Sequence, residues 1–354
     1  MPNRRAFLAG LLASGMTAEL SWADAGGPSH LTAAMRPDGT YVLVGVRPGG
    51  ELAFTQPLPG RGHAAVAHPA RPEAVAFARR PGTYALVIDC VSGRVLQHLS
   101  APAGHHFYGH GAFSADGLRL FTTENHIASG QGRIGIWARE DGYARVGDMS
   151  SGGIGPHEML RLPGQATLAV ANGGLLTRPE TGREKLNLGT MRPNLTLMRE
   201  EGEIMAQAAL PEALHHSSLR HIAGRADGSV ACGFQWEGDP FDSPALVGLY
   251  RDGALHLLDS PPQATRRLNA YVGSVAGLPD GRIAVTSPRG GVVQVFDPTL
   301  GFLSQSPQAD ICGVAASGGA GLATDGLGGV HHVGERLTRI GQHDLAFDNH
   351  LVAI

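Results

Sequence analysis

A histidine recurs at a fixed distance from a turn glycine along this chain. His110 stands seven residues before Gly117, and His157 and His221 each stand seven residues before another glycine. Each interval holds a short apolar run and ends in a turn, which predicts a β-strand running into a tight turn. A repeated strand-and-turn unit restricts the fold to an array of similar β-units.

The apolar pattern gives the size of the repeated unit. From residue 26 onward, apolar runs of about five to seven residues alternate with clusters of Gly, Pro, Asp and Asn, and no helical period persists. The runs fall into one group of three strands, at 31–59, and then into groups of four. A four-stranded unit repeating every 40 to 50 residues or so is typical of a β-propeller blade of the WD40-like kind.

The positions that stand at this seven-residue interval before a turn, which we call the histidine frame, predict the number of blades. His63, Ser274, Cys312 and His350 occupy the equivalent place in further units, which gives seven blade starts in all. The N-terminal group lacks one strand and residues 347–354 supply an extra one. We therefore expect an all-β, seven-bladed β-propeller over residues 26–354, closed by pairing of the N- and C-terminal strands in one blade, which leaves no open sheet edge.

The first 25 residues have the pattern of an export signal. Arg4-Arg5 precedes a short apolar run at 9–18, and Ala23-Asp24-Ala25 forms an A-x-A cleavage site. An arginine pair in this context resembles a twin-arginine signal peptide, which predicts a mature protein in the periplasm of a Gram-negative cell. The run is too short to serve as a stable membrane anchor.

Charge and cysteine content narrow the choice of ligand. The chain has a formal net charge of -3, and it contains no run of basic residues, which argues against a nucleic-acid partner. Of the three cysteines, Cys90 and Cys232 are expected to be small buried core residues. Cys312 occupies one position of the histidine frame and is therefore a candidate ligand.

The framed residues are candidate metal ligands. The first strand of each propeller blade lines the central channel, so these positions should converge at one mouth of the channel. Imidazole and thiolate groups suit iron, copper or zinc, whereas calcium and magnesium prefer oxygen ligands. The predicted metal ligands are His63, His110, His157, His221, His350 and Cys312.

Polar residues on the same face are expected to support that site. Carboxylates and amides near an imidazole can orient its ring, and arginines suit an anionic ligand. Arg79, Arg80 and Arg289 are expected on this face, and the basic stretch 175–193 is expected to lie over it as a loop, with a second insertion at 238–243. The candidate cofactor-binding residues are Glu124, Glu158, Asn172 and Arg220.

Several long motifs resemble a known family. They include GHHFYGHGAFSADGLRLFTTEN, GGIGPHEM, VANGGLLTRPETGREKLNLGTM and SSLRHIA. They are similar to those of a family of twin-arginine-exported bacterial propeller proteins of unknown function. Members of that family are typically encoded beside imelysin-type, iron-regulated periplasmic proteins and a di-haem protein, which implies a part in iron uptake or iron-linked redox handling. This chain departs from the family's pattern at Arg178-Pro179, where His-Pro is expected.

Several functions are compatible with the sequence. The favoured one is a periplasmic propeller that binds iron or copper, with zinc as a further option, at the histidine-rich hub. An enzyme is the second, in which a metal at the channel mouth serves hydrolysis or redox chemistry. The third is a scaffold that docks an imelysin-type or haem-containing periplasmic protein, with the 175–193 loop as the contact. A purely structural histidine hub, or one that binds an anion or small molecule without a metal, also fits the pattern.

Overall fold

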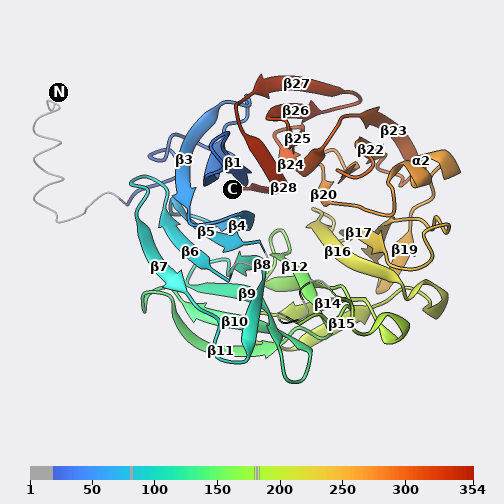
Figure 1. The fold of residues 1–354 in the computed structure, drawn as a ribbon, viewed down its shortest axis with the longest axis horizontal. Coiled ribbons are helices and arrows are strands. Elements are labelled where there is room, and N and C mark those ends of the chain that lie inside the picture. The colour runs from blue at the N-terminus through green and yellow to red at the C-terminus, as the bar shows by residue number, and fades with distance from the viewer. Residues whose placement is uncertain (1–18, 80–82, 179, 181, 183) are drawn as a thin grey trace, which may run out of the picture.

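The computed structural model describes residues 19–79, 83–178, 180, 182 and 184–354, and within them the strands form seven four-stranded antiparallel sheets. The sheets are arranged radially around a central axis (Figure 1). The predicted seven-bladed β-propeller is thus confirmed. Most of the predicted signal peptide, together with Arg80, lies outside the described residues.

The first four blades follow one another from the N-terminus. The first contains β28 (Ala346–Ala353), β1 (His30–Met35), β2 (Tyr41–Val46) and β3 (Leu52–Leu58). The second contains β4 (Gly62–Ala67), β5 (Glu73–Ala78), β6 (Ala85–Asp89) and β7 (Val95–Leu99). The third contains β8 (His105–Phe113), β9 (Arg119–His126), β10 (Gln131–Ala138) and β11 (Ala144–Ser150). The fourth contains β12 (Pro156–Arg161), β13 (Thr167–Asn172), β14 (Asn194–Arg199) and β15 (Ile204–Ala208).

The remaining three blades complete the circle. The fifth contains β16 (Ser217–Gly224), β17 (Val230–Trp236), β18 (Val247–Arg251) and β19 (Ala254–Leu257). The sixth contains β20 (Ser274–Gly277), β21 (Ile283–Ser287), β22 (Val292–Phe296) and β23 (Phe302–Pro307). The seventh contains β24 (Ile311–Ser317), β25 (Ala320–Asp325), β26 (Gly329–Val333) and β27 (Leu337–Gln342). The innermost strands β28, β4, β8, β12, β16, β20 and β24 contact one another in a closed ring.

The last strand of the chain closes that ring. β28 pairs antiparallel with β1, with His30 opposite Ala353 and Met35 opposite Ala346. On its other side β28 contacts β24 of the seventh blade, so the C-terminal strand joins the two ends of the array. The closure predicted from the three-stranded N-terminal group is confirmed.

The apolar core lies between neighbouring blades. Middle strands such as β13 are buried along their whole length, whereas outer strands such as β23 alternate between partly buried and exposed residues. One core cluster joins Phe77 of β5 to Phe113 and Trp137 of the next blade, and another joins Val42 of β2 to Val330 of β26. Each sheet therefore buries both faces against its neighbours, and the core is a circle of inter-blade layers.

The two predicted insertions both follow the second strand of their blades. Residues 173–193 connect β13 to β14 and include the short 3-10 helix η2 (Leu188–Thr190), and residues 237–246 connect β17 to β18. A second 3-10 helix, η3 (Glu212–Leu214), and the helix α2 (Pro262–Arg267) were not predicted, because segments this short carry no measurable helical period. None of the helices in the described residues is long and apolar enough to cross a membrane.

Deleting residues 347–354 should destabilise the whole propeller. The deletion removes most of β28 with the buried side chains of Phe347 and Leu351, and it exposes an edge of β1 and the surface of β24 that packs against β28. We expect the melting temperature to fall by about 10 °C or more. Removal of Ile354 alone, which lies beyond β28, is the matched control and should change the melting temperature little. Equal melting of the eight-residue truncation and the wild type would contradict this account.

Candidate metal centre

Breaks in strand register direct the side chains of the five histidines of the histidine frame into the channel. In β12, Pro156 and Glu158 lie opposite successive residues of β13, Asn172 and Ala171. His157 is therefore an extra residue with no partner opposite it. In β16 the extra residue is Arg220, directly before His221. A β-bulge of this kind turns two successive side chains toward one face, where a regular strand would turn one. Further breaks lie at 63–64 in β4, 108–110 in β8 and 348–350 in β28.

A glycine makes the closest approach between two of these strands possible. Gly109 has a φ of 98°, a conformation that side chains disfavour. A Cβ atom at this position would lie 2.7 Å from Cδ2 of the His63 ring. Gly109 therefore allows His63 and His110 to meet across adjacent blades.

The five framed histidines form one cluster. The His350 ring lies 4.5 Å from that of His110, 4.6 Å from that of His63 and 5.1 Å from that of His221, between ring centroids. The His157 ring lies 5.0 Å from both His110 and His221. Four of the five are buried, at 7% exposure or less, and His63 is half-buried. The propeller thus places five imidazoles from five blades side by side at its axis.

Hydrogen bonds fix the tautomer of two of these rings. Nδ1 of His157 lies 3.0 Å from the carbonyl oxygen of Arg220 and donates to it. Nδ1 of His221 lies 3.1 Å from Oε2 of Glu158 and donates to that carboxylate when the latter is ionised. With the proton on Nδ1, the lone pair of each ring is on Nε2, the atom that binds metal in carboxylate–histidine–metal arrangements.

Three buried ring nitrogens in the cluster have no hydrogen-bond partner among the described residues. They are Nδ1 of His63, Nε2 of His221 and Nε2 of His350. Buried polar atoms in folded proteins are nearly always paired, so an unpaired set at one place indicates a missing ligand or solvent. Two groups of donors have ligand atoms within 4.8 Å of one another: His63, His110 and His350, and Glu158, His221 and His350.

Burial keeps the cluster neutral. It is the main reason why the pKa of His63, His110 and His157 lies well below the ordinary value, and why that of His350 falls to about 4. Neighbouring imidazoles and the guanidinium groups of Arg79 and Arg220 lower these pKa values further. Burial raises the pKa of Glu158 to about 7. Neutral imidazoles beside a carboxyl group that ionises near neutrality are suited to bind a cation.

The other two framed residues do not join the cluster. The Oγ of Ser274 donates to the carbonyl oxygen of Val314, 3.3 Å away in the next inner strand. The Sγ of Cys312 lies 3.2 Å from the carbonyl oxygen of Thr324, and burial raises the pKa of this thiol well above its ordinary value. Neither belongs to a donor group in the described part of the chain, so both bond to neighbouring backbone instead.

Glu124 and Asn172 lie inside their own blades. Both oxygens of Glu124 accept hydrogen bonds from Arg145, and the residue is fully buried. Asn172 is bonded to Ser151 and Thr196. The structure thus separates these two residues from Glu158 and Arg220, which do reach the histidine cluster or the space beside it.

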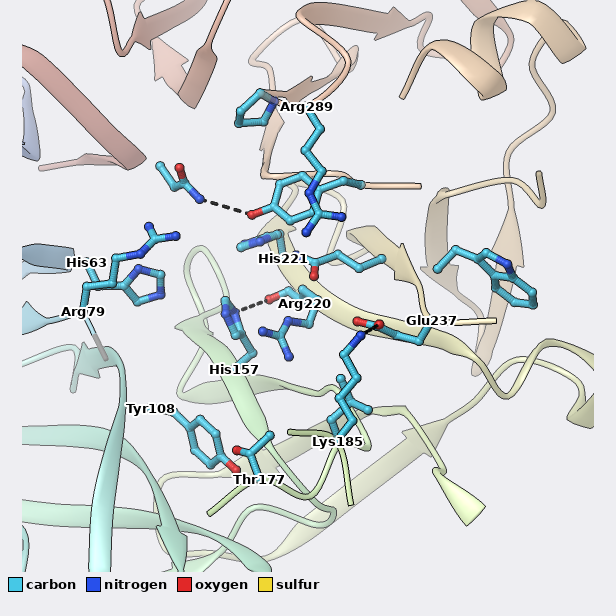
Figure 2. Close-up of a pocket in the computed structure, with 16 residues that line it drawn as sticks. His63, Arg79, Tyr108, His157, Thr177, Lys185, Arg220, His221, Glu237 and Arg289 are labelled. Carbon is cyan, nitrogen blue, oxygen red and sulfur yellow. Dashed lines mark hydrogen bonds and ion pairs between the residues drawn. The ribbon is translucent and has the colours of Figure 1, made fainter. Parts of the chain in front are cut away.

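The channel has a cavity on each side of the cluster. One, of about 400 Å³, is bordered by His63, His157 and His221 and by Arg79, Arg220 and Arg289, as Figure 2 shows. We call it the arginine cavity. The other, of about 380 Å³, lies toward the far ends of the same inner strands, where small residues dominate, and His110 and Glu158 reach it. The cluster can therefore be approached from either end of the channel.

The fold and the site define the class of protein. It is a seven-bladed propeller with a histidine cluster in its central channel. Residues 56–354 match the family described as "Protein of unknown function (DUF1513)", and the chain belongs to that family.

Comparisons with other proteins support the fold alone. No curated protein sequence matches the chain. A chain in the crystal structure of the Mitotic Checkpoint Complex is similar, with a TM-score of 0.56 and 12% identity over 78% of each chain. The computationally designed Ika8 protein is similar, with a TM-score of 0.54 and 14% identity over 90% of this chain and 88% of that one. Likeness at this identity shows a shared propeller and carries no function.

Acid should destabilise the metal-free protein. The unfolded chain binds protons on these histidines below pH 6.5 or so, whereas the folded cluster resists protonation down to about pH 4 at His350 and about pH 3 at His221. The stability contributed by each neutral imidazole is complete above pH 6.5 and is lost as the pH falls through that window, by up to about 1.4 kcal/mol per pH unit. Glu158 has the opposite effect, because its raised pKa favours the folded state at lower pH. The five histidines together outweigh this single carboxyl group.

Chemical denaturation at pH 7.5 and pH 5.0 with chelator present measures this dependence. The His63→Asn variant should lose less stability between the two values than the wild type. His98→Asn, which changes an exposed histidine of β7, should behave as the wild type. A wild-type unfolding free energy that is the same at both pH values would contradict the argument.

Proposed function

We propose that this protein binds a transition metal ion at the histidine cluster and takes part in periplasmic iron acquisition or iron-linked redox handling. The observation that carries the proposal is the set of buried ring nitrogens of His63, His221 and His350, which have no partner among the described residues. These atoms come from three different blades and belong to histidines of two donor groups that share His350. Hydrogen bonding within the protein does not satisfy them, whereas a cation would.

The donor set selects the class of metal. Each donor group contains at least two imidazoles, and only one contains a carboxylate. Imidazole is a ligand for iron, copper and zinc, whereas calcium in propeller hydrolases requires several oxygen donors. The cluster therefore favours a transition metal over a calcium-dependent lactonase-type site.

His350 and Glu158 have different roles in the proposed site. His350 is common to both donor groups and would hold the ion wherever it lies in the cluster. Glu158 fixes the ring of His221 and supplies the negative charge that offsets the cation. A bound iron or copper ion would supply Lewis-acid or one-electron chemistry.

The choice of iron and of the periplasm rests on sequence. The first residues resemble a twin-arginine signal, and the long motifs resemble a family encoded beside iron-regulated periplasmic proteins. Copper and zinc fit the same ligands, so the metal has to be measured.

Elemental analysis of purified protein, before and after reconstitution, tests the proposal. We expect about one equivalent of iron, copper or zinc in the wild type and less than about 0.2 in the His350→Ala variant, because that variant loses the ligand common to both donor groups. His98→Ala is the matched control. His63→Gln is a second variant in case His350→Ala does not fold, which thermal melting will show. A wild type that takes up less than about 0.2 equivalents of each metal would rule the proposal out.

A further inference from the structure

The arginine cavity carries a strong positive charge directly beside the histidine cluster. Its lining includes Arg79, Arg220, Arg289 and Lys185 and, among the described residues, a single acid, Glu237. That acid is already paired with Lys185. Three guanidinium groups thus face a space of about 400 Å³, a volume that suits a small ligand.

The three arginines come from separate blades and surround the cavity. Arg79 follows β5, Arg220 is the bulged residue of β16, and Arg289 follows β21; Figure 2 shows them around the cavity. The buried carboxylate of Asp348 pairs with Arg79 at 2.7 Å and also with Arg61, so it holds Arg79 in place and offsets part of the positive charge. Arg289 lies over the Tyr271 ring, 4.4 Å from its centroid.

This charge makes the cavity a poor place for a bare cation. Even with the carboxylate of Glu158 nearby, a metal ion bound by neutral imidazoles keeps a net positive charge, and guanidinium groups in the adjoining space repel it. An anion bound in the cavity removes that repulsion. Planar guanidinium groups bind carboxylates in a bidentate way, so three of them suit a ligand with more than one carboxylate.

We propose that the arginine cavity binds a small oligocarboxylate, so that the substrate of the histidine cluster is a metal–oligocarboxylate complex. The inference rests on the proposed function for its metal and on the arginine cavity for its anion. Asn349, whose side-chain amide donates to the Tyr271 hydroxyl 3.2 Å away, and Tyr108 provide further polar contacts around the ligand.

Isothermal titration calorimetry tests this inference with four probes: citrate, ferric citrate, ferric ion in a non-carboxylate buffer complex, and inorganic phosphate. We expect ferric citrate to bind the wild type at least tenfold more tightly than any of the other three. The Arg289→Ala variant should weaken binding of ferric citrate and of citrate by tenfold or more, because it removes an exposed guanidinium group without disturbing the core. Arg94→Ala, at an exposed turn remote from the cavity, is the matched control.

The outcomes separate this inference from the proposed function. Equal binding of ferric citrate by Arg289→Ala and Arg94→Ala would overturn the oligocarboxylate site and leave metal binding by the histidines intact. Phosphate binding as tight as that of citrate would overturn the choice of ligand class. Citrate binding that Arg289→Ala abolishes, together with no uptake of metal by the wild type, would support the anion site and reject the proposed metal function.

Discussion

The convergence of seven inner strands on one axis is the constraint on which the rest of this structure depends. Near the axis the strands crowd one another, and side chains that point inward lose contact with water. An ordinary propeller can fill this space with small or apolar residues. Here five strands place an imidazole there, and each break in register lies at or directly before the histidine. The bulges therefore direct five imidazole groups toward one region of the crowded axis.

The sequence predicted the frame of this arrangement because the frame is periodic. Seven blade starts, the three-stranded first group and the closing strand can all be read from spacing and alternation. The same spacing placed Cys312 and Ser274 with the histidines, and the structure shows why spacing was insufficient there. A thiol or a hydroxyl group reaches a neighbouring carbonyl oxygen, as Cys312 and Ser274 do, whereas an imidazole ring extends further into the channel.

Residues whose partners lie on distant strands could not be predicted. Glu124 is occupied by Arg145, which is 21 residues away on the fourth strand of the same blade, and nothing in the local sequence shows that pairing. Glu158 is adjacent to a bulged histidine and reaches the channel for that reason. Glu124 lies on β9, the second strand of its blade, whereas Glu158 lies on the innermost strand β12, and this difference separates a blade-stabilising ion pair from a candidate ligand.

The position of His350 connects the site to the closure of the ring. It lies on β28, the strand that also completes the first blade. A ring without β28 holds four of the five imidazoles but not the one shared by both donor groups. Under the proposed function, an ion would bind fully only when the ring has closed, and it would then hold β28 in place by mass action. Metal binding would in that case report that the ring is complete.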